Sequence, residues 1–204
     1  MSKKFENPGF DSTIFVSSQH IADTAKEFSE VAISLAKEPL DAHDVKRNVI
    51  FTNATFAIEL YFKAFFVKRV SAPFDFIVKN DQVEQADYME ENRVTMWHSR
   101  LEVPKEYQKH DLHFLFNALS DELKERVMQE VLLASHSIKT PTDLQEFFKD
   151  IKCFFVDKRY EFQRFIYGVP NDSHVIHVLI PVLKAIGKAL ANPPEASFSE
   201  FTGD

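Results

Sequence analysis

The chain has 204 residues, a formal net charge of −7, 45% hydrophobic residues and 27% charged residues. This length and apolar fraction exclude a disordered chain and allow a domain with a substantial core. Four glycines and one cysteine exclude collagen-like and disulfide-rich proteins, and 21 phenylalanines beside so few glycines favour a helical bundle. The negative charge argues against a broad nucleic-acid-binding surface, although it is compatible with a local basic site.

The cysteine content and the apolar segments indicate the compartment. Cys153 has no intrachain disulfide partner, which fits a reducing environment. The N-terminal residues contain no apolar run of signal-peptide length. Residues 54–67 and 175–191 both carry charged side chains and fall short of the ~20 apolar residues that a membrane span needs. We therefore expect a soluble, cytoplasmic protein that makes no contact with membranes.

The first half of the chain predicts a loose arm over residues 1–17 and then two helices. Ser18 is expected to cap a first helix whose apolar residues recur three and four positions apart: Ile21, Ala25, Phe28, Val31, Ala32 and Leu35. The second helix, over about residues 42–69, is apolar around most of its circumference. Its polar residues fall in one stripe, namely Asn48, Thr52, Thr55, Glu59 and Lys63. This stripe either faces solvent, with Glu59 and Lys63 as an ion pair, or lines a polar cleft.

The segment at residues 70–109 interrupts the helical pattern. It contains Pro73, Pro104 and an alternating apolar stretch at residues 74–78. Forty residues without helical periodicity are long for a plain loop. We expect an irregular insert here, either a β-hairpin or a lid.

Helical signals resume at Asp111, which is the expected cap of the next helix. Ser120 is expected to cap a helix that runs to about His136. Pro141 and a Thr142/Gln145 capping box predict a long helix that continues to Gly168. The last helix is expected to start at Asn171 or Asp172, end at Pro193 and Pro194, and leave a polar tail over residues 193–204. The prediction is a single all-α domain over residues 18–192, with five or six helices and the insert at 70–109.

Several kinds of chemistry lack their sequence signals. There is no glycine-rich phosphate loop and no Gly-x-Ser-x-Gly motif, and Cys153 sits in an apolar context typical of a buried structural cysteine. Two His-x-x-His pairs occur, at residues 110/113 and 174/177, but neither has an acidic residue placed as in zinc-protease motifs. We expect no metal and no cofactor.

Three segments resemble the motifs of one protein family, in the family's order and rough spacing. Residues 53–66 read NATFAIELYFKAFF and resemble an A-x-E-L-Y-L-K-A-L helix. Residues 109–116 read KHDLHFLF and resemble a G-H-D-L-x-x-L helix start, and residues 155–161 read FVDKRYE and resemble an F-x-x-x-R-Y-x-x-E helix. These are motifs of HEPN domains, which the chain resembles over residues 41–166.

The resemblance implies an up-and-down helical bundle, commonly dimeric, of toxin–antitoxin and defence systems. Many such domains are metal-independent ribonucleases with an Arg-x4–6-His pair, in which His exchanges protons and Arg stabilises charge on phosphorus oxygens. Others are non-catalytic and bind nucleotides or associate with a small nucleotidyltransferase. We expect a homodimer here, with the helix near residues 142–166 at its interface, and we expect RNA, a nucleotide, a nucleotidyltransferase or an antitoxin as partner.

The catalytic pair of the family is not matched where the resemblance places it. Arg159 and Arg164 have no His at the required spacing, and only Arg93 does, with His98 in the insert. One such match is expected by chance among seven arginines and eight histidines. We therefore expect that His98→Ala leaves any RNA cleavage unchanged, and that the domain is not strongly catalytic.

A group of polar residues from the three motifs is the candidate ligand-binding site: Glu59, Lys63, His110, Asp111, Arg159, Tyr160 and Glu161. Two interpretations stay open, an ion network that stabilises the bundle and a small pocket for nucleotide or RNA phosphate. The leading hypothesis is a binding domain for nucleic acid, a nucleotide or a partner protein. The alternatives are a metal-independent ribonuclease that pairs Arg159 with His110, and a structural module whose phenylalanine-rich surface docks a partner.

Overall fold

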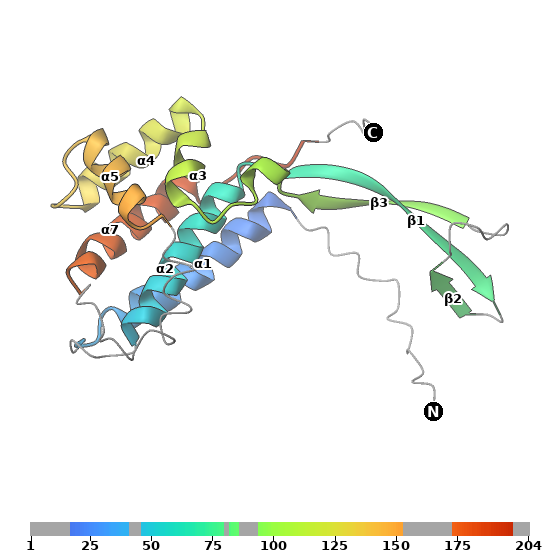
Figure 1. The fold of residues 1–204 in the computed structure, drawn as a ribbon, viewed down its shortest axis with the longest axis horizontal. Helices are drawn as coiled ribbons and strands as arrows, with labels where there is room; N and C mark the ends of the chain where they lie inside the picture. Colours follow the sequence, from blue (N-terminus) through green and yellow to red (C-terminus); the bar gives the residue numbers. More distant parts are fainter. Residues whose placement is uncertain (1–16, 41–45, 80–81, 86–93, 153–172, 198–204) are drawn as a thin grey trace.

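A computed structural model describes residues 17–40, 46–79, 82–85, 94–152 and 173–197. Within these residues, six α-helices form one body and three β-strands extend away from it (Figure 1). The helices are α1 (Ser18–Leu35), α2 (Lys46–Lys63), α3 (Leu112–Ala118), α4 (Asp121–Ala134), α5 (Pro141–Asp150) and α7 (Ser173–Leu190). A 3-10 turn, η1 (Lys105–Tyr107), precedes α3. The predicted helical bundle is confirmed for the body.

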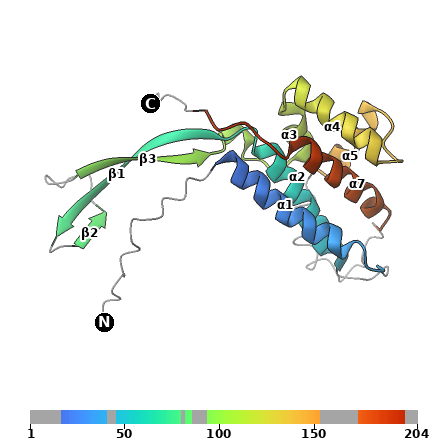
Figure 2. The same ribbon diagram turned by 180° about the vertical axis from the view of Figure 1, so that it is seen from behind.

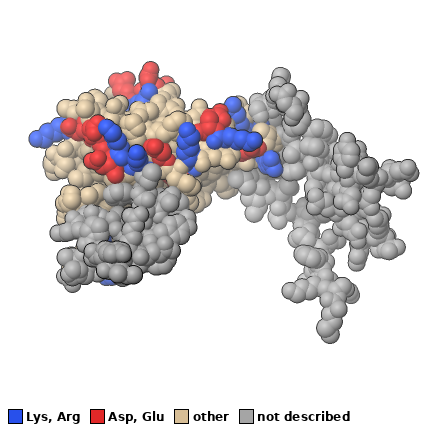
Figure 3. All heavy atoms as spheres, in the orientation of Figure 1, with Lys and Arg blue, Asp and Glu red and all other residues tan. Residues whose placement is uncertain are grey.

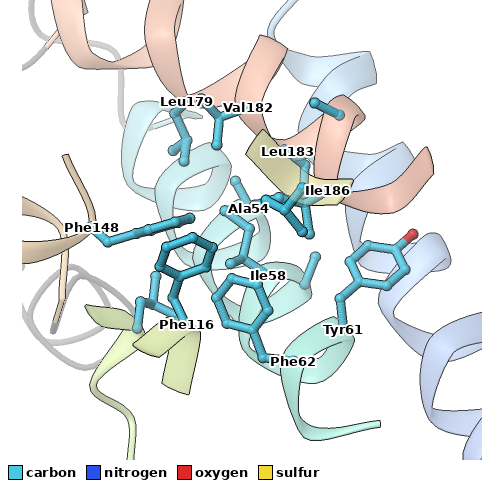
Figure 4. Close-up of a cluster of buried hydrophobic side chains, with 14 of the residues drawn as sticks. Ala54, Ile58, Tyr61, Phe62, Phe116, Phe148, Leu179, Val182, Leu183 and Ile186 are labelled. Atoms are coloured by element: carbon cyan, nitrogen blue, oxygen red, sulfur yellow. The ribbon is translucent and has the colours of Figure 1, made fainter. Parts of the chain in front are cut away.

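The body is built around α2, which contacts α1, α7 and α3, while α4 packs against α7 and α3 against α5 (Figures 1 and 2). Aromatic side chains join three of these helices, because the ring centroid of Phe148 lies 5.6 Å from that of Phe62 and 4.8 Å from that of Phe116. Figure 4 shows this cluster together with aliphatic residues of α7. None of the described helices combines the length and apolar character that a membrane span requires.

Helix α1 approaches its neighbours through small residues. Its buried positions are Ser18, Ala22, Ala25, Ser29 and Ala32. The expected apolar stripe is therefore only partly correct, since Val31 is exposed. The helix begins at Ser18 as a helical residue, and Ser17 is its N-cap, one position earlier than predicted. Small side chains let the backbones of α1, α2 and α7 come close, which the stripe of larger apolar residues did not indicate.

The segment expected to be irregular is a β-sheet. Strands β1 (Lys68–Lys79), β2 (Gln82–Gln85) and β3 (Val94–Glu102) are antiparallel in the order β2-β1-β3. We call these three strands the β-arm. Of the two alternatives, the irregular lid was thus wrong and the β-hairpin right, because β1 pairs with β3 from Lys68 opposite Glu102 to Phe76 opposite Val94.

Three predicted helix starts are confirmed by their caps. The side chain of Asp111 accepts a hydrogen bond from the Phe114 amide, and Ser120 and Thr140 cap α4 and α5 in the same way. The capping box of α5 pairs Thr140 with Asp143 rather than Thr142 with Gln145.

The long helix predicted to reach Gly168 is wrong in its end point. Helix α5 stops at Asp150, because the chain turns at residues 151–152. The Lys152 carbonyl then accepts a hydrogen bond from the Leu112 amide at 3.1 Å, which ties this turn to the start of α3. Residues 153–168 lie outside the described part of the chain.

The residues after α7 run back along the body rather than away from it. Gln19 donates a hydrogen bond to the Ala191 carbonyl at 3.0 Å, and the Ser18 hydroxyl donates to the Pro194 carbonyl. The Arg69 amide then donates to the Ser197 carbonyl at 2.9 Å. The described part of the predicted polar tail therefore joins the start of α1 to the base of the β-arm.

Candidate functional site

The candidate site is organised by one buried carboxylate. Glu59 lies in the last turns of α2, between residues that fill the core, and is only 1% exposed. Helical periodicity places Thr55 one turn before it and Lys63 one turn after it. Thr55 is also buried and donates to the Phe51 carbonyl at 2.7 Å. The interpretation of this stripe as solvent-facing is therefore wrong for both Thr55 and Glu59.

Two nitrogen donors converge on Glu59. Lys63 Nζ lies 2.7 Å from Glu59 Oε1, and the Lys63 side chain is 13% exposed. His110 Nδ1 lies 3.0 Å from each carboxylate oxygen of Glu59, and the His110 side chain is 50% exposed. The buried charge is thus paired, as a carboxylate in a protein interior must be. The expected Glu59–Lys63 pair is confirmed, and His110 joins it from 51 residues further along the chain.

The start of α3 fixes the position of His110. Asp111 follows it and uses its carboxylate as the N-cap, so Oδ1 accepts from the Phe114 amide at 2.9 Å. The Asp111 carboxylate therefore caps the helix. Among the described residues, no hydrogen bond or ion pair joins it to Glu59 or Lys63. Arg159, Tyr160 and Glu161, the remaining members of the predicted group, lie outside the described residues.

Tyr107 and Phe114, which flank His110 in the sequence, belong to an aromatic group that the sequence did not single out. Phe66 and Tyr107 stack with ring centroids 4.2 Å apart, and Tyr107 lies 6.4 Å from Phe114. Lys109 Nζ sits 4.1 Å from the centroid of the Phe114 ring, a cation–π contact. The only signal in the sequence was the adjacency of Lys109 to His110. The contact between Phe66 and Tyr107 depends on the return of the chain from the β-arm.

The base of the β-arm is locally basic. Figure 3 shows cationic and anionic side chains interspersed on the face that reaches this base. The two chain segments that meet there, residues 68–73 and 97–110, carry five Lys and Arg residues against two Glu residues. Four of those cations are exposed: Lys68, Arg100, Lys105 and Lys109. One of them, Arg100, pairs with Glu102 at 3.4 Å. A chain of net charge −7 therefore has a local excess of exposed cations in the segments that lead to His110, and such an excess can attract phosphate.

A concave region that contains none of the predicted site residues lies between α1 and α7 and has a volume of about 390 Å³. Tyr61 of α2 forms its floor, and Figure 4 shows the Tyr61 hydroxyl directed away from the apolar cluster. Burial raises the pKa of the Tyr61 phenol above its ordinary value of 10.0. A side-chain hydrogen bond with Ser29 opposes the rise, and the charges of Glu30 and Asp23 add to it. No pattern in the sequence indicates this groove, because it arises where three helices meet.

The described residues offer no assembled metal centre, since no group of three or more His, Cys, Asp or Glu side chains among them is arranged to hold an ion. The chain matches no protein-family model, and no curated protein or solved structure is significantly similar to it.

Proposed function

We propose that this protein is a HEPN-like domain that binds the phosphate groups of RNA or a nucleotide on the surface formed by Lys109 and His110, next to the largely buried Glu59–Lys63 pair. The observation that carries the proposal is the geometry of Glu59, a buried carboxylate that holds one cation in the protein and one imidazole at the surface. When the imidazole is protonated, the Glu59–Lys63–His110 group has a net positive charge beside the basic base of the β-arm.

The second donor to Glu59 favours a binding role over a scaffold role. Lys63 alone compensates the charge of Glu59 at 2.7 Å. His110 is half exposed, and its contact with both carboxylate oxygens fixes the orientation of a ring that solvent and ligands reach. A fixed, exposed donor loses little side-chain entropy when it binds an anion, which is the advantage of a preorganised site.

The family assignment rests on the meeting of two motif segments. Residues 53–66 lie mostly on α2 and residues 109–116 start α3, and Glu59 and His110 join the two segments by a direct contact. In the HEPN-like interpretation, the protein acts with a nucleotidyltransferase or an antitoxin in a defence or toxin–antitoxin system.

A metal-independent ribonuclease is the second candidate, and the same contact favours it. A carboxylate that accepts a hydrogen bond from one imidazole nitrogen fixes the tautomer and orientation of the ring, as in catalytic triads. A histidine held in this way can remove the proton of a 2′-hydroxyl and can protonate a leaving oxygen. Glu59 would then be a positioning residue and His110 the general base.

Binding is tested by fluorescence anisotropy with a labelled single-stranded RNA and with a labelled nucleotide, each over a range of salt concentrations. We expect the affinity to fall with rising salt. His110→Ala and Lys109→Ala should each weaken binding roughly tenfold, since a charge-assisted hydrogen bond contributes about 1.5–3 kcal/mol. Lys149→Ala, which removes an exposed cation of α5 that pairs with Glu146, is the charge-matched control and should bind like the wild type. Salt-independent or absent binding would contradict the proposal.

Cleavage distinguishes the two candidates. The wild type is incubated with RNA in the presence of EDTA, beside the same sequence with 2′-deoxy sugars. Cleavage of the RNA alone, lost at least about 100-fold in His110→Ala, would establish the ribonuclease. Binding without cleavage supports the binding domain. If the protein binds neither RNA nor nucleotide, the interaction-module hypothesis replaces both.

A further inference from the structure

The β-arm has one strand edge that the described chain covers and one that it leaves open. The order β2-β1-β3 makes β3 an edge strand along all of its residues, Val94–Glu102. Backbone N–H and C=O groups on such an edge are ready to pair with another strand. The ribbon therefore has two outer edges, one on β1 and one on β3, and the described chain covers them to different extents.

The outer edge of β1 is covered at both ends and interrupted by a proline between them. At its base, the Arg69 amide bonds to the Ser197 carbonyl, and at its far end residues 76–79 pair with β2. In an antiparallel ladder, alternate residues direct both backbone groups to the same side. Because the backbone groups of Arg69 are directed away from β3, those of Ser71 and Pro73 are too. Pro73 has no N–H, so the stretch between the two covered ends is unfit for pairing.

The outer edge of β3 has no such protection among the described residues. Ser99 and Trp97 stand opposite Ser71 and Pro73 in the register. Two residues opposite each other in a non-hydrogen-bonded pair both direct their backbone groups away from the partner strand. The backbone N–H and C=O groups of Ser99 and Trp97 are therefore directed away from β1. The β3 sequence VTMWHSRLE contains no proline and no lysine, which are common devices that guard an exposed edge, and its charged residues Arg100 and Glu102 lie at the base end of the strand.

We propose that a second copy of this chain pairs with the open edge of β3, so that the two β3 strands run antiparallel about a two-fold axis. The charges along the arm fit a second copy in this orientation. Residues 80–93, which connect the far ends of the strands, carry five acidic residues and one basic residue. The base carries Lys68, Arg69 and Arg100 against Glu102. Antiparallel pairing brings the acidic end of each arm towards the basic base of the other, whereas parallel pairing would juxtapose like charges.

Full overlap of the two strands places the two-fold axis at His98, the midpoint of Val94–Glu102. Each residue of β3 then faces a residue equally far from His98 on the other side, so Trp97 meets Ser99 of the second copy and Thr95 meets Leu101. The result is a six-stranded sheet in the order β2-β1-β3-β3-β1-β2. A two- or three-stranded ribbon without a covering layer has little stability of its own, and pairing doubles the number of strands.

A pair of proline variants tests which edge is used. Ser99→Pro removes an outward N–H of β3, and Ser71→Pro removes the matching N–H on the outer edge of β1. Neither change removes a bond between β1 and β3. Light scattering at micromolar concentration should show a dimer for the wild type and for Ser71→Pro, and a monomer for Ser99→Pro. Circular dichroism verifies that the three proteins share the same helical content. A monomeric wild type, or a dimer that persists in Ser99→Pro, overturns the proposal.

Cysteine cross-linking tests the axis without weakening the interface. All variants carry Cys153→Ser, so the introduced thiol is the only one. His98→Cys should form a disulfide-linked dimer under mild oxidation, since directly opposed residues on antiparallel strands have Cα atoms about 4.5–5.5 Å apart, within disulfide reach. Thr95→Cys should not link to itself, because the two copies would be about 20 Å apart, but should link to Leu101→Cys in a mixture. Cross-linking of Thr95→Cys with itself and not with Leu101→Cys overturns this register.

Discussion

A Cβ atom at Gly187 of α7 would lie 3.1 Å from the hydroxyl oxygen of Tyr61 of α2. The absence of a side chain at this position lets α7 pass directly over the end of the tyrosine. Tyr61 is only 4% exposed although it forms the floor of the groove between α1 and α7. Gly187 therefore sets the depth of that groove.

Gly187→Ala is expected to destabilise the protein despite its position inside a helix. Alanine gains about 0.5–1 kcal/mol in helix propensity, but overfilling a tight contact costs about 1–3 kcal/mol. The net loss should be about 1 kcal/mol by urea unfolding. In a Tyr61→Phe background the clashing oxygen is absent, so the same change should become stabilising. If Gly187→Ala has the same effect in both backgrounds, the contact with the hydroxyl is not the cause.

The raised pKa of Tyr61 predicts a loss of stability at alkaline pH. Burial, its main cause, keeps the phenol protonated in the folded state at pH values where the unfolded chain already loses the proton. The unfolded state therefore binds fewer protons above pH 10.0, and the free energy of unfolding falls there by at most about 1.4 kcal/mol per pH unit for one proton. Below pH 10.0 the effect is absent. The test measures the unfolding free energy of the wild type and of Tyr61→Phe from pH 8 to 11, a range about the ordinary tyrosine pKa. The wild-type value minus the Tyr61→Phe value should fall as the pH rises. A constant difference would show that Tyr61 titrates normally.

Asp111 is expected to matter for the start of α3. Its carboxylate accepts the Phe114 amide, so Asp111→Ala should cost about 1 kcal/mol of stability, as the loss of an N-cap does. Asp111→Asn keeps an acceptor oxygen and is the matched control, with a loss of a few tenths of that. Thermal unfolding of both variants measures the effect. Equal losses in the two variants would mean that the negative charge, rather than the cap, is what the helix needs.

The sequence predicted best what depends on neighbouring residues. The start of α4 was predicted from Ser120, because an N-cap is a local hydrogen bond between residues three apart. The start of α5 was predicted from Pro141, although its cap is Thr140 and not the expected Thr142. A β-hairpin was one of two alternatives for residues 70–109, but its strands and register were not predicted, although residues 74–78 alternate. The register depends on the pairing of β1 with β3, from Lys68 opposite Glu102 to Phe76 opposite Val94. Pairing between distant segments leaves no short-range pattern to recognise.

The candidate site shows the same division. Helical spacing predicted the Glu59–Lys63 pair, since both residues lie on one face of α2. The meeting of Glu59 with His110 came only from the resemblance of two segments to one family. The burial of Glu59 was left as one of two alternatives, because a stripe of polar residues on a helix looks the same whether it faces water or a neighbouring helix. The groove under Gly187 requires three helices in place and could not be predicted from any of them.

The three members of the Glu59 group should differ widely in their contribution to stability. Lys63→Met leaves a buried carboxylate whose remaining donor among the described residues is His110. This variant should therefore lose the most unfolding free energy, about 3 kcal/mol. Glu59→Gln should lose less, because the lysine and the histidine that it releases both reach water. His110→Gln should stay within about 1 kcal/mol of the wild type, since the side chain is half exposed and glutamine retains an N–H donor.

The double variant Glu59→Gln/Lys63→Met removes both charges and should recover most of the loss of Lys63→Met, as replacement of a whole buried pair usually does. Urea unfolding of the four proteins at pH 7 gives these values directly. A loss below about 1 kcal/mol for Lys63→Met, or no recovery in the double variant, would mean that Glu59 is not held in the protein as a buried charge. The argument that Glu59 orients His110 would then be contradicted as well.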